Sequence, residues 1–447
     1  MSKNKYLDRR SQNQRFYLTT AIPYVNGKPH IGHALEYLVA DAIHRYQELS
    51  GKNVFLSSGA DENALKNVQA AEKEGIEVQK FLDKNSKVFE DFYAKLGVEL
   101  DEFRRGSDEK EHWPGVQKLW ELVERNGDLY KKTYKGMYCI GCESFKTQKE
   151  LVDGKCPEHD KEPEEVEEEN YFFKLSKYQD KLLSLIENDE FRIFPEKRKN
   201  EAVAFIKGGL EDFSVSRSNK RAKGVGVPVP GDESQKMYVW FDALTIYMTA
   251  VGYGTNQELW EKWWPANLHI IGKDIFRFHA IYWPAMLMSA DLPLPKELLV
   301  HGFITSGGKK MSKTIGNVVD PYEIIEKYGV ESLRYYLLSQ IPTLDDGDFT
   351  EERFREVYQA DLANGLGNLV ARVMQLAQTH LDKSERPNTQ DFPNEYTEAI
   401  ESFELNKALE IVWNLIKELD LKITQTEPFN LVKKDQEAAK KIILEAT

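Results

Sequence analysis

The stretch YVNGKPHIGHALEYLVAD, residues 24–41, decides how this chain folds and what it can bind. A turn with glycine and proline runs into regularly spaced apolar residues, which predicts a helix that stops at Gly51. His30 and His33 fall at the helix start, where free backbone N–H groups and the helix dipole favour an anion. Because a spacing of three puts both rings on one side, the pattern predicts phosphate binding, with surface or capping histidines as the alternative.

A second stretch, TSGGKKMSKTIGN at residues 305–317, has the composition of a basic loop. Two glycines precede Lys309, Lys310 and Lys313, with Ser312 among them, directly after a strand-like segment. Such a loop can close on a polyphosphate and neutralise the charge that develops during phosphoryl transfer. Taken alone, the stretch is better explained as a solvated basic turn.

Composition limits the classes of partner. The chain has 447 residues, 41% of them hydrophobic, and a net charge of -13, which predicts several domains with apolar cores and no global positive field. Any RNA contact therefore has to be local. No apolar run is long enough for a bilayer or a signal core, so we expect no membrane partner. Three cysteines, an odd number, argue against a disulfide framework and for a reducing compartment, the cytoplasm.

The pattern of apolar residues changes along the chain. Strand and helix signals alternate in residues 15–112 and again in 228–325, which predicts two halves of one parallel-sheet α/β domain. Between them, residues 113–227 contain short strands, the cysteines and an acidic run at 158–170 that predicts a solvated loop or edge. The remainder, from about residue 326, has helical periodicity almost throughout.

The cysteines give the most specific independent pattern. Cys139 and Cys142 in CIGC are followed after thirteen residues by Cys156 and His159 in CPEH. Two close pairs of such ligands fit a closed tetrahedral Zn²⁺ site without an open position, so we expect one structural zinc per chain. A redox C-x-x-C is the alternative, but it lacks the βαβ context and leaves the second pair unexplained.

HIGH at 30–33 and KMSKT at 310–314 together resemble the two signatures of class I aminoacyl-tRNA synthetases. Four longer stretches narrow the resemblance to the methionyl-tRNA synthetase family, over most of residues 15–447: AIPYVNGKPHIGHALEY, YVWFDAL, HIIGKDIFRFHAIYWPAML and HGFITSGGKKMSKTIGN. The resemblance implies a division into five parts. These are a Rossmann-type catalytic domain split into 15–112 and 228–325, an inserted connective domain with a zinc knuckle at 113–227, a stem-contact linker at 326–357, and a helical anticodon-binding bundle at 358–447.

The resemblance also implies a reaction. The methionine carboxylate attacks the α-phosphate of ATP, pyrophosphate leaves, and the methionyl group then esterifies the terminal adenosine of tRNA. His30 and His33 would hold the phosphates, and Lys310 and Lys313 would steady the departing pyrophosphate with Mg²⁺. The other positions that match ATP contacts are Gly32, Glu36, Gly272, Asp274 and Ser312.

A methionine pocket needs an anion for the ammonium group and an apolar, polarisable wall for the thioether. Asp61 in SSGADENAL matches the family's ammonium-binding aspartate. The other matching positions are Ala21, Ile22 and Tyr24 at a strand end, Trp240, Ala243 and Tyr247 in the wall, and Ile275 and His279 near the sulfur. A tyrosine hydroxyl and an imidazole there can donate weakly to the sulfur. Without the resemblance, Trp240 and Tyr247 are better explained as core packing.

The helical part, 358–447, contains 10 Lys and Arg against 15 Asp and Glu, so recognition of an anticodon would rest on stacking and base-edge contacts. Asn368 and Arg372 match anticodon-reading positions, and Phe429 stands where the family commonly has a stacking tryptophan. Without the resemblance, a polar helix face explains them better. The implied partners are ATP, L-methionine, and initiator and elongator methionine tRNA, with no DNA.

Three other functions stay open: another class I synthetase, a nucleotidyltransferase that adenylates a small acid without tRNA, and a catalytically silent tRNA-binding relative. The insertion of about 115 residues leaves little room for the editing domain of leucyl, isoleucyl and valyl enzymes, whose pockets discriminate a methylene poorly. The zinc pattern and the helical tail argue against the second function. The intact signature histidines and lysines argue against the third.

The sequence departs from the family pattern at several positions. Asn63 and Ala64 replace a usual His-Gly pair, Thr314 replaces serine in the basic signature, and Val225 replaces an aromatic residue. The chain ends at AAKKIILEAT, where the family continues with more helices, so we expect the helical bundle to be truncated.

Overall fold

The structure is a computed structural model that describes residues 14–139, 144–146, 151–157, 160–311, 317–381 and 392–446. These residues form two compact units. The first unit contains the described residues up to Pro29 together with Ala40–His301. The second unit contains His30–Val39 and the described residues from Gly302 onward. Each unit has an apolar cluster of its own.

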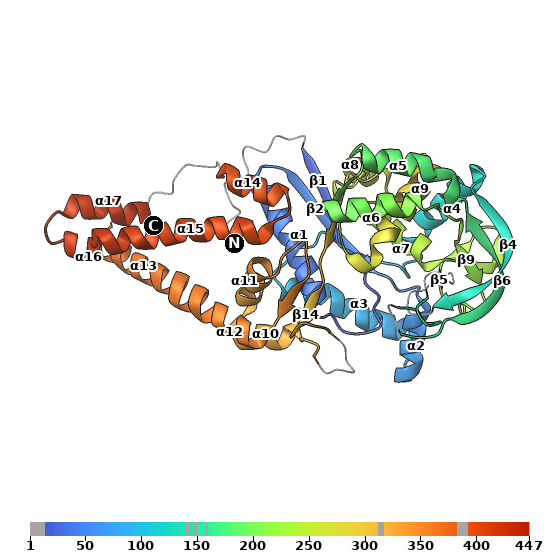
Figure 1. Ribbon diagram of the computed structural model, residues 1–447, viewed down its shortest axis with the longest axis horizontal. Helices are drawn as coiled ribbons and strands as arrows, with labels where there is room; N and C mark the ends of the chain where they lie inside the picture. Colours follow the sequence, from blue (N-terminus) through green and yellow to red (C-terminus); the bar gives the residue numbers. More distant parts are fainter. Residues whose placement is uncertain are drawn as a thin grey trace. The chain divides into compact units, whose positions relative to one another are not determined.

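A six-stranded, wholly parallel sheet lies at the centre of the first unit, in the order β3-β2-β1-β12-β13-β7 (Figure 1). The two predicted halves meet where β1 pairs with β12, with Leu18 opposite Leu268. This pairing confirms the predicted α/β fold with a parallel sheet built from two separated parts of the chain. The strands are β1 Arg15–Thr19, β2 Asn53–Ala60, β3 Glu102–Arg105, β7 Arg192–Phe194, β12 Leu268–Gly272 and β13 Glu297–His301.

The edge strand β7 departs from the predicted division of the chain, since it lies inside 113–227 and yet pairs with β13. The inserted part therefore contributes to the central sheet as well as to its own sheets. The helices that the chain forms before, between and after these strands are α1 Ile31–Leu49, α2 Leu65–Glu74, α3 Val78–Lys95, α4 Trp113–Arg125, α5 Gln179–Glu187, α6 Glu196–Lys207, α7 Val239–Thr249, α8 Gln257–Trp263 and α9 Trp283–Ser289. Shorter helical turns are Leu175–Tyr178, Lys273–Ile275 and Phe278–Tyr282.

Helix α7 is buried along its whole length, which makes it the core helix of the first unit. Helix α4 lies directly against it. A Cβ atom on Gly115 of α4 would lie 2.4 Å from the Thr249 side chain and 2.5 Å from the Tyr253 carbonyl oxygen. Only glycine permits that approach, because real Cβ atoms do not come so close to other heavy atoms.

The inserted part forms an antiparallel sheet in the order β5-β4-β6-β8. Its strand β9 also belongs to a second antiparallel sheet, in the order β10-β11-β9, whose other two strands follow residue 227. The acidic run ends in β6, which pairs with β4 along its length and with β8 only at Phe172 and Phe173. The acidic half of β6 thus behaves as the predicted solvated edge, although it is a strand. The bounds are β4 Leu129–Cys139, β5 Ser144–Lys146, β6 Glu164–Phe173, β8 Phe213–Ser214, β9 Ser216–Ser218, β10 Pro228–Val229 and β11 Asp232–Met237.

The second unit is mainly helical, as predicted for the residues from 326, with one small sheet in the order β15-β14-β16. Helices α13, α15 and α17, drawn orange to red in Figure 1, share a cluster that includes Leu369, Val373 and Ile423. The strands are β14 Ile304–Ser306, β15 Lys309–Lys310 and β16 Gly347–Phe349. The helices are α10 Pro321–Tyr328, α11 Val330–Gln340, α12 Glu351–Val357, a π-helical segment Tyr358–Gly367, α13 Asn368–His380, α14 Asn394–Glu401, α15 Leu405–Thr426, α16 Pro428–Leu431 and α17 Gln436–Ala446.

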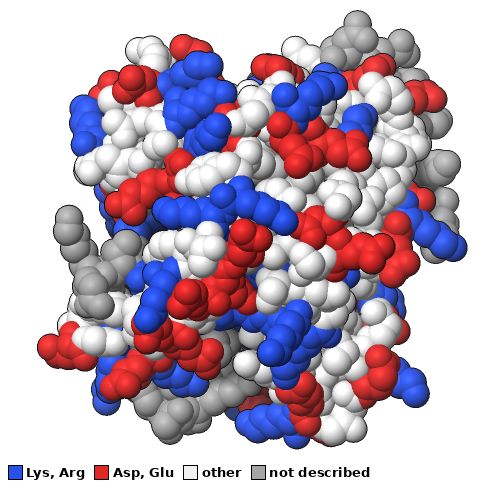
Figure 2. All heavy atoms as spheres, turned by 90° about the vertical axis from the view of Figure 1, so that its right-hand side faces the viewer, with Lys and Arg blue, Asp and Glu red and all other residues white. Residues whose placement is uncertain are grey.

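Charge is mixed on the face that Figure 2 shows, where Lys and Arg alternate with Asp and Glu without a continuous area of one sign. This agrees with the net charge of -13 and with the absence of a global basic field expected from it. Among the described helices, none combines the length and the apolar character that crossing a membrane requires.

Candidate active site

The two signature histidines lie together at the start of α1, in the second unit. Their rings stack with centroids 3.9 Å apart and planes 29° apart, which confirms that the spacing of three puts both rings on one side. The backbone N–H of His30 donates to Nδ1 of His33, and that of Gly32 donates to Nδ1 of His30, each at 3.1 Å. Because Nδ1 accepts in both neutral rings, each ring carries its proton on Nε2.

This geometry changes one part of the prediction. We expected the N–H groups at this helix start to be open to an anion, but two of them bond to the imidazoles, which therefore act as caps in this arrangement. Because Nδ1 of each ring accepts a backbone hydrogen bond, Nε2–H is the donor that each ring would offer to a phosphate. Gly32 permits the folded-back ring, because a Cβ there would lie 3.0 Å from Cε1 of His30.

The second signature begins as a hairpin in the same compact unit as His30 and His33. Lys310 in β15 pairs with Thr305 of β14, and Gly307 and Gly308 form the turn with φ of 61° and 71°. Positive φ at both positions is the requirement of a tight hairpin turn. The two other predicted residues of this loop, Ser312 and Lys313, lie outside the described residues.

Glu36, the remaining predicted ATP residue of α1, is 6% exposed. In the first unit, Gly272 ends β12 and Asp274 follows in the next turn, exposed to solvent. A Cβ on Gly272 would lie 2.9 Å from Oδ1 of Asp274 and 3.7 Å from Nε2 of His301. Glycine therefore lets this carboxylate fold over the end of the strand.

Asp61, the predicted ammonium ligand, lies just beyond the ends of β1 and β2. Tyr24 and Asp61 form a parallel bridge beyond the two strands, and the backbone N–H of Asp61 donates to the Pro23 carbonyl at 2.9 Å. Asp61 is 2% exposed. Parallel strands end at one edge of the sheet, and this edge is where ligands bind in open α/β folds. The structure therefore brings Ala21, Ile22, Tyr24 and Asp61 to the expected edge.

The predicted aromatic wall lies on α7. Trp240, Ala243 and Tyr247 are spaced by three and four residues, which puts them on one helix face. The ring of Trp240 meets that of Tyr24 edge-on, with centroids 6.3 Å apart, so the wall and the strand end lie next to each other. Trp240 also stacks on Phe278, with centroids 3.8 Å apart and planes 9° apart.

Phe278 was not predicted. It lies one residue before His279 and belongs to the same short helical turn. The sequence signal was the pair of phenylalanines around Arg277, but nothing in a single sequence says which aromatic ring stacks on Trp240.

His279 contacts the wall differently from the expectation. Its Nδ1–H donates to the Ile275 carbonyl at 3.0 Å, and its Nε2 accepts from the Tyr247 hydroxyl at 2.7 Å. Burial lowers the pKa of His279 to about 4, so the ring is neutral at physiological pH. In this arrangement both the imidazole donor and the tyrosine proton are engaged, and neither points at a thioether.

A second buried histidine lies beneath this wall and was also missed. His269 of β12 shares a hydrogen bond of 2.7 Å with the Thr19 hydroxyl of β1, its register partner. Its ring lies 4.5 Å from that of Tyr247. Burial, followed by the nearby His279, lowers the pKa of His269 well below its ordinary value. The signal was a lone histidine inside the apolar strand LHIIG.

Only two of the four predicted zinc ligands, Cys139 and Cys156, lie within the described residues, since Cys142 and His159 lie outside them. Cys139 ends β4 and is 3% exposed, and Cys156 is fully buried. Near Cys156, Val152 and Lys155 form one backbone bridge, and Cys156 and Lys161 form another. In the described part of the chain, no group of three or more His, Cys, Asp or Glu is arranged to hold a metal. Buried thiols are suitable ligands for a structural zinc, so Cys139 and Cys156 agree with the prediction in chemical type, and the zinc site stays a prediction.

The predicted anticodon residues are surface residues of the second unit. Asn368 and Arg372 share one face of α13, one turn apart, and Arg372 pairs with Asp420 of α15. Phe429 of α16 is 51% exposed, unusually open for a large apolar ring. These positions are accessible to a ligand, and their role stays a prediction.

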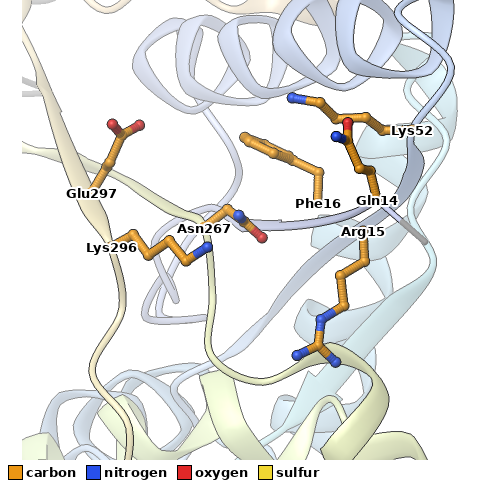
Figure 3. A pocket seen from close by; sticks show the side chains of 7 residues that line it. All are labelled: Gln14, Arg15, Phe16, Lys52, Asn267, Lys296 and Glu297. Atoms are coloured by element: carbon orange, nitrogen blue, oxygen red, sulfur yellow. The ribbon is translucent and has the colours of Figure 1, made fainter. Parts of the chain in front are cut away.

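A cavity of about 490 Å³ lies at the opposite, amino-terminal edge of the central sheet (Figure 3). Arg15 donates from this edge to the Trp264 carbonyl at 3.4 Å, and the Asn267 side chain accepts from the Tyr17 N–H at 2.9 Å. Ligands of open α/β sheets bind at the other edge, so we do not assign the predicted chemistry to this cavity. Its lining residues are Gln14, Arg15, Phe16, Lys52, Asn267, Lys296 and Glu297.

The fold and these sites agree with one class of protein. A family model described as "tRNA synthetases class I (M)" matches residues 16–165 and 159–374, which defines an α/β class I aminoacyl-tRNA synthetase fold. Methionine–tRNA ligase of Clostridium acetobutylicum is 42% identical over 445 residues, covering 96% of this chain and 68% of that protein. The Brucella suis ligase is 48% identical over 368 residues, covering 81% and 70%. The chain belongs to the methionyl-tRNA synthetase family.

A solved structure gives the same result at the level of the fold. Mycobacterium tuberculosis methionyl-tRNA synthetase in complex with methionyl-adenylate superposes with a TM-score of 0.88 at 38% identity. The match covers 97% of this chain and 88% of that chain.

We predict that His279 makes the first unit less stable in mild acid. Its pKa is about 4 when folded and about 6.5 when unfolded, so between these values only the unfolded chain binds the proton. The free energy of unfolding therefore falls as pH decreases from 6.5 to 4, by up to about 1.4 kcal/mol per pH unit. Urea unfolding of the parent and of His279→Gln, followed by tryptophan fluorescence at pH 7.5, 6 and 5, measures this. The stability difference between the two should shrink in acid, and parallel curves would contradict the assignment.

Proposed function

We propose that the protein acts as a methionine–tRNA ligase. It activates methionine with ATP and charges tRNA, and the relatives that it matches carry the name methionine–tRNA ligase. The observation that best supports this from the chain itself is the buried carboxylate of Asp61 beside the aromatic wall of Trp240, at the carboxyl edge of the parallel sheet. We also propose the cytoplasm as its compartment, on the argument from cysteine usage.

In the first step, a carboxylate oxygen of methionine forms a bond to the α-phosphorus of ATP as the bond to pyrophosphate breaks. The Nε2–H groups of His30 and His33 donate to the phosphate oxygens, where negative charge builds up. Lys310 and Lys313 neutralise the leaving pyrophosphate together with the Mg²⁺ that enters bound to ATP. The remaining ATP contacts are those of Gly32, Glu36, Gly272, Asp274 and Ser312.

Methionine is held by its two ends. The carboxylate of Asp61 accepts hydrogen bonds from the ammonium group, and its buried position makes that charge pairing stronger than in water. The thioether lies against the polarisable rings of the wall. The pocket residues are Ala21, Ile22, Tyr24, Asp61, Trp240, Ala243, Tyr247, Ile275 and His279.

In the second step, a ribose hydroxyl of the terminal adenosine of tRNA attacks the methionyl carbonyl, and AMP leaves. Residues 358–447 bind the anticodon through Asn368, Arg372 and Phe429, and 326–357 contacts the tRNA stem. Initiator and elongator methionine tRNAs are both substrates, while DNA and membranes are not partners. Cys139, Cys142, Cys156 and His159 hold one structural zinc, which stabilises the inserted part and takes no step in the reaction.

The function is tested by two assays on the whole chain. We expect methionine-dependent exchange between ATP and pyrophosphate without tRNA, and ester formation only when methionine tRNA is added. Exchange without ester formation would indicate the adenylating nucleotidyltransferase, and tRNA binding without exchange would indicate the silent relative. If leucine, isoleucine or valine supported exchange as well as methionine does, the assignment to methionine would fail.

Gly32→Ala should slow activation, since its Cβ would displace the His30 ring that lies 3.0 Å away and disturb both Nε2–H donors. We expect kcat for exchange to fall about 100-fold, the usual effect of losing one transition-state donor, with KM for methionine unchanged. Gly208→Ala at the end of α6 is the matched control and should stay within about twofold of the parent, on the scale at which surface changes are neutral. If Gly32→Ala kept the kcat of the parent, the proposal that His30 donates to the phosphate would be contradicted.

The zinc proposal has a readout apart from activity. We expect about one equivalent of zinc per chain by elemental analysis, and a loss of most of it in Cys139→Ser. Aminoacylation should weaken through disorder of the inserted part, while KM for ATP stays unchanged. His380→Ala, outside the knuckle, should retain the metal. A zinc-free parent with full activity would refute the proposal.

A further inference from the structure

Helix α7 carries a buried carboxylate that has no role in the proposed mechanism and does not line the proposed methionine pocket. Asp242 lies between Trp240 and Ala243 in sequence and is 2% exposed. Its Oδ1 accepts from Nε2 of His112 at 2.5 Å, and its Oδ2 accepts from Nδ2 of Asn63 at 2.5 Å. Both oxygens are therefore satisfied by side chains from outside α7, which is what makes a carboxyl group tolerable in the interior.

The hydrogen bonds continue beyond Asp242 in both directions. The Asn63 amide also donates to the Gly106 carbonyl at 2.8 Å. Nδ1 of His112, a fully buried residue just before α4, lies 2.8 Å from the Thr249 hydroxyl at the end of α7. The chain of contacts thus ties the loop after β2, the turn after β3, the start of α4 and both halves of α7 to one another.

Asn63 lies two residues after Asp61, the proposed ammonium ligand. The backbone of this loop is also held by α2, since Nδ2 of Asn67 donates to the Asp61 and Glu62 carbonyls at 2.8 and 3.1 Å. Arg105 donates to the fully buried Glu62 at 2.8 Å. These contacts hold the loop to α2 and to β3, and the hydrogen bond from Asn63 to Asp242 holds it to α7.

The position of Asp242 around the axis of α7 shows what its hydrogen bond with Asn63 can control. Trp240 and Ala243 share the helix face that forms the wall, and Asp242, two residues after Trp240, points about 200° away from it, given about 100° per residue. Asp242 is therefore a positioning residue and not a substrate contact. By fixing α7 to the Asp61 loop, it fixes the separation between the two ends of the pocket.

We infer that His112, Asp242 and Asn63 form a brace that sets the length of the amino-acid pocket, so that it fits methionine and excludes longer side chains. This inference rests on the proposed function. If the brace is loosened, the wall can move relative to Asp61, and a side chain one methylene longer is accommodated more easily. At position 63, where the family usually has histidine, this chain has an asparagine, and its amide makes the contact with Asp242.

The brace is tested with Asn63→Asp, which keeps the shape of the side chain but replaces the donor by a carboxylate facing Asp242. We expect KM for methionine in the exchange assay to rise about tenfold, while KM for ATP stays within about twofold, because like charges in a buried site repel each other. The preference for methionine over ethionine, its S-ethyl homologue, should fall several-fold. A general loss of structure would change all three parameters and the melting temperature together.

The matched control is Asn126→Asp. Nδ2 of Asn126 donates to the Ser289 carbonyl at 2.6 Å and to Asp291 at 3.3 Å, so the substitution also puts a carboxylate beside an aspartate, away from the pocket and in a solvent-exposed place. We expect its exchange kinetics to be unchanged. If it raised KM for methionine as much as Asn63→Asp does, the brace would have no special role.

The variant Asp242→Asn and the double variant Asn63→Asp with Asp242→Asn complete a double-mutant cycle and keep the test valid if one single variant fails to fold. The double variant exchanges donor and acceptor between the two positions, so we expect it to recover at least about threefold in KM relative to Asn63→Asp. The brace would be overturned if the two substitutions changed KM for methionine independently, so that the double variant showed the product of the single effects. An unchanged preference for methionine over ethionine would also overturn it. A parent chain without methionine-dependent exchange would instead overturn the proposed function.

Discussion

The pairing of β1 with β12 is the constraint on which the first unit depends. These strands are about 250 residues apart in sequence and lie side by side in the sheet, with the Thr19 hydroxyl bonded to His269 between them. Both strands are buried, so their register is fixed by apolar side chains on both faces. Tyr24, Gly272 and the turn to His279 follow from the ends of these two strands. A slip in this register would displace all of them at once.

Local patterns predicted most of the fold, while the roles of the site residues that they named stay predictions. The histidine spacing predicted the stacked rings, and alternation of strand and helix signals predicted the parallel sheet. What the sequence did not reveal depends on partners far along the chain. The bond from Asn63 to Asp242 spans 179 positions, and β7 joins a sheet from inside an insertion. A helix pattern likewise does not tell whether its first N–H groups face a ligand or an imidazole.

Two histidines are buried beneath the aromatic wall of α7. His269 and His279 are both fully enclosed, and burial holds the pKa of each well below its ordinary value. Neutral imidazoles fix the direction of every hydrogen bond around them, because each ring has one donor and one acceptor. Tyr247 consequently has its proton held by His279. These hydrogen bonds restrict movement beneath the wall. Because the buried rings resist protonation, the free energy of unfolding falls as the pH decreases.

The small sheet of the second unit joins two segments that the domain division separates. Strand β14, which carries the lysine hairpin, pairs in parallel with β16 of the stem-contact linker, from Ile304 opposite Gly347 to Ser306 opposite Phe349. Asp348 accepts from the Gly308 N–H at 2.8 Å, so the hairpin turn itself is fastened to the linker. Any swing of the lysine hairpin has to carry β16 with it or shear these hydrogen bonds. The lysine hairpin and the strand β16 are thus held together as parts of one sheet.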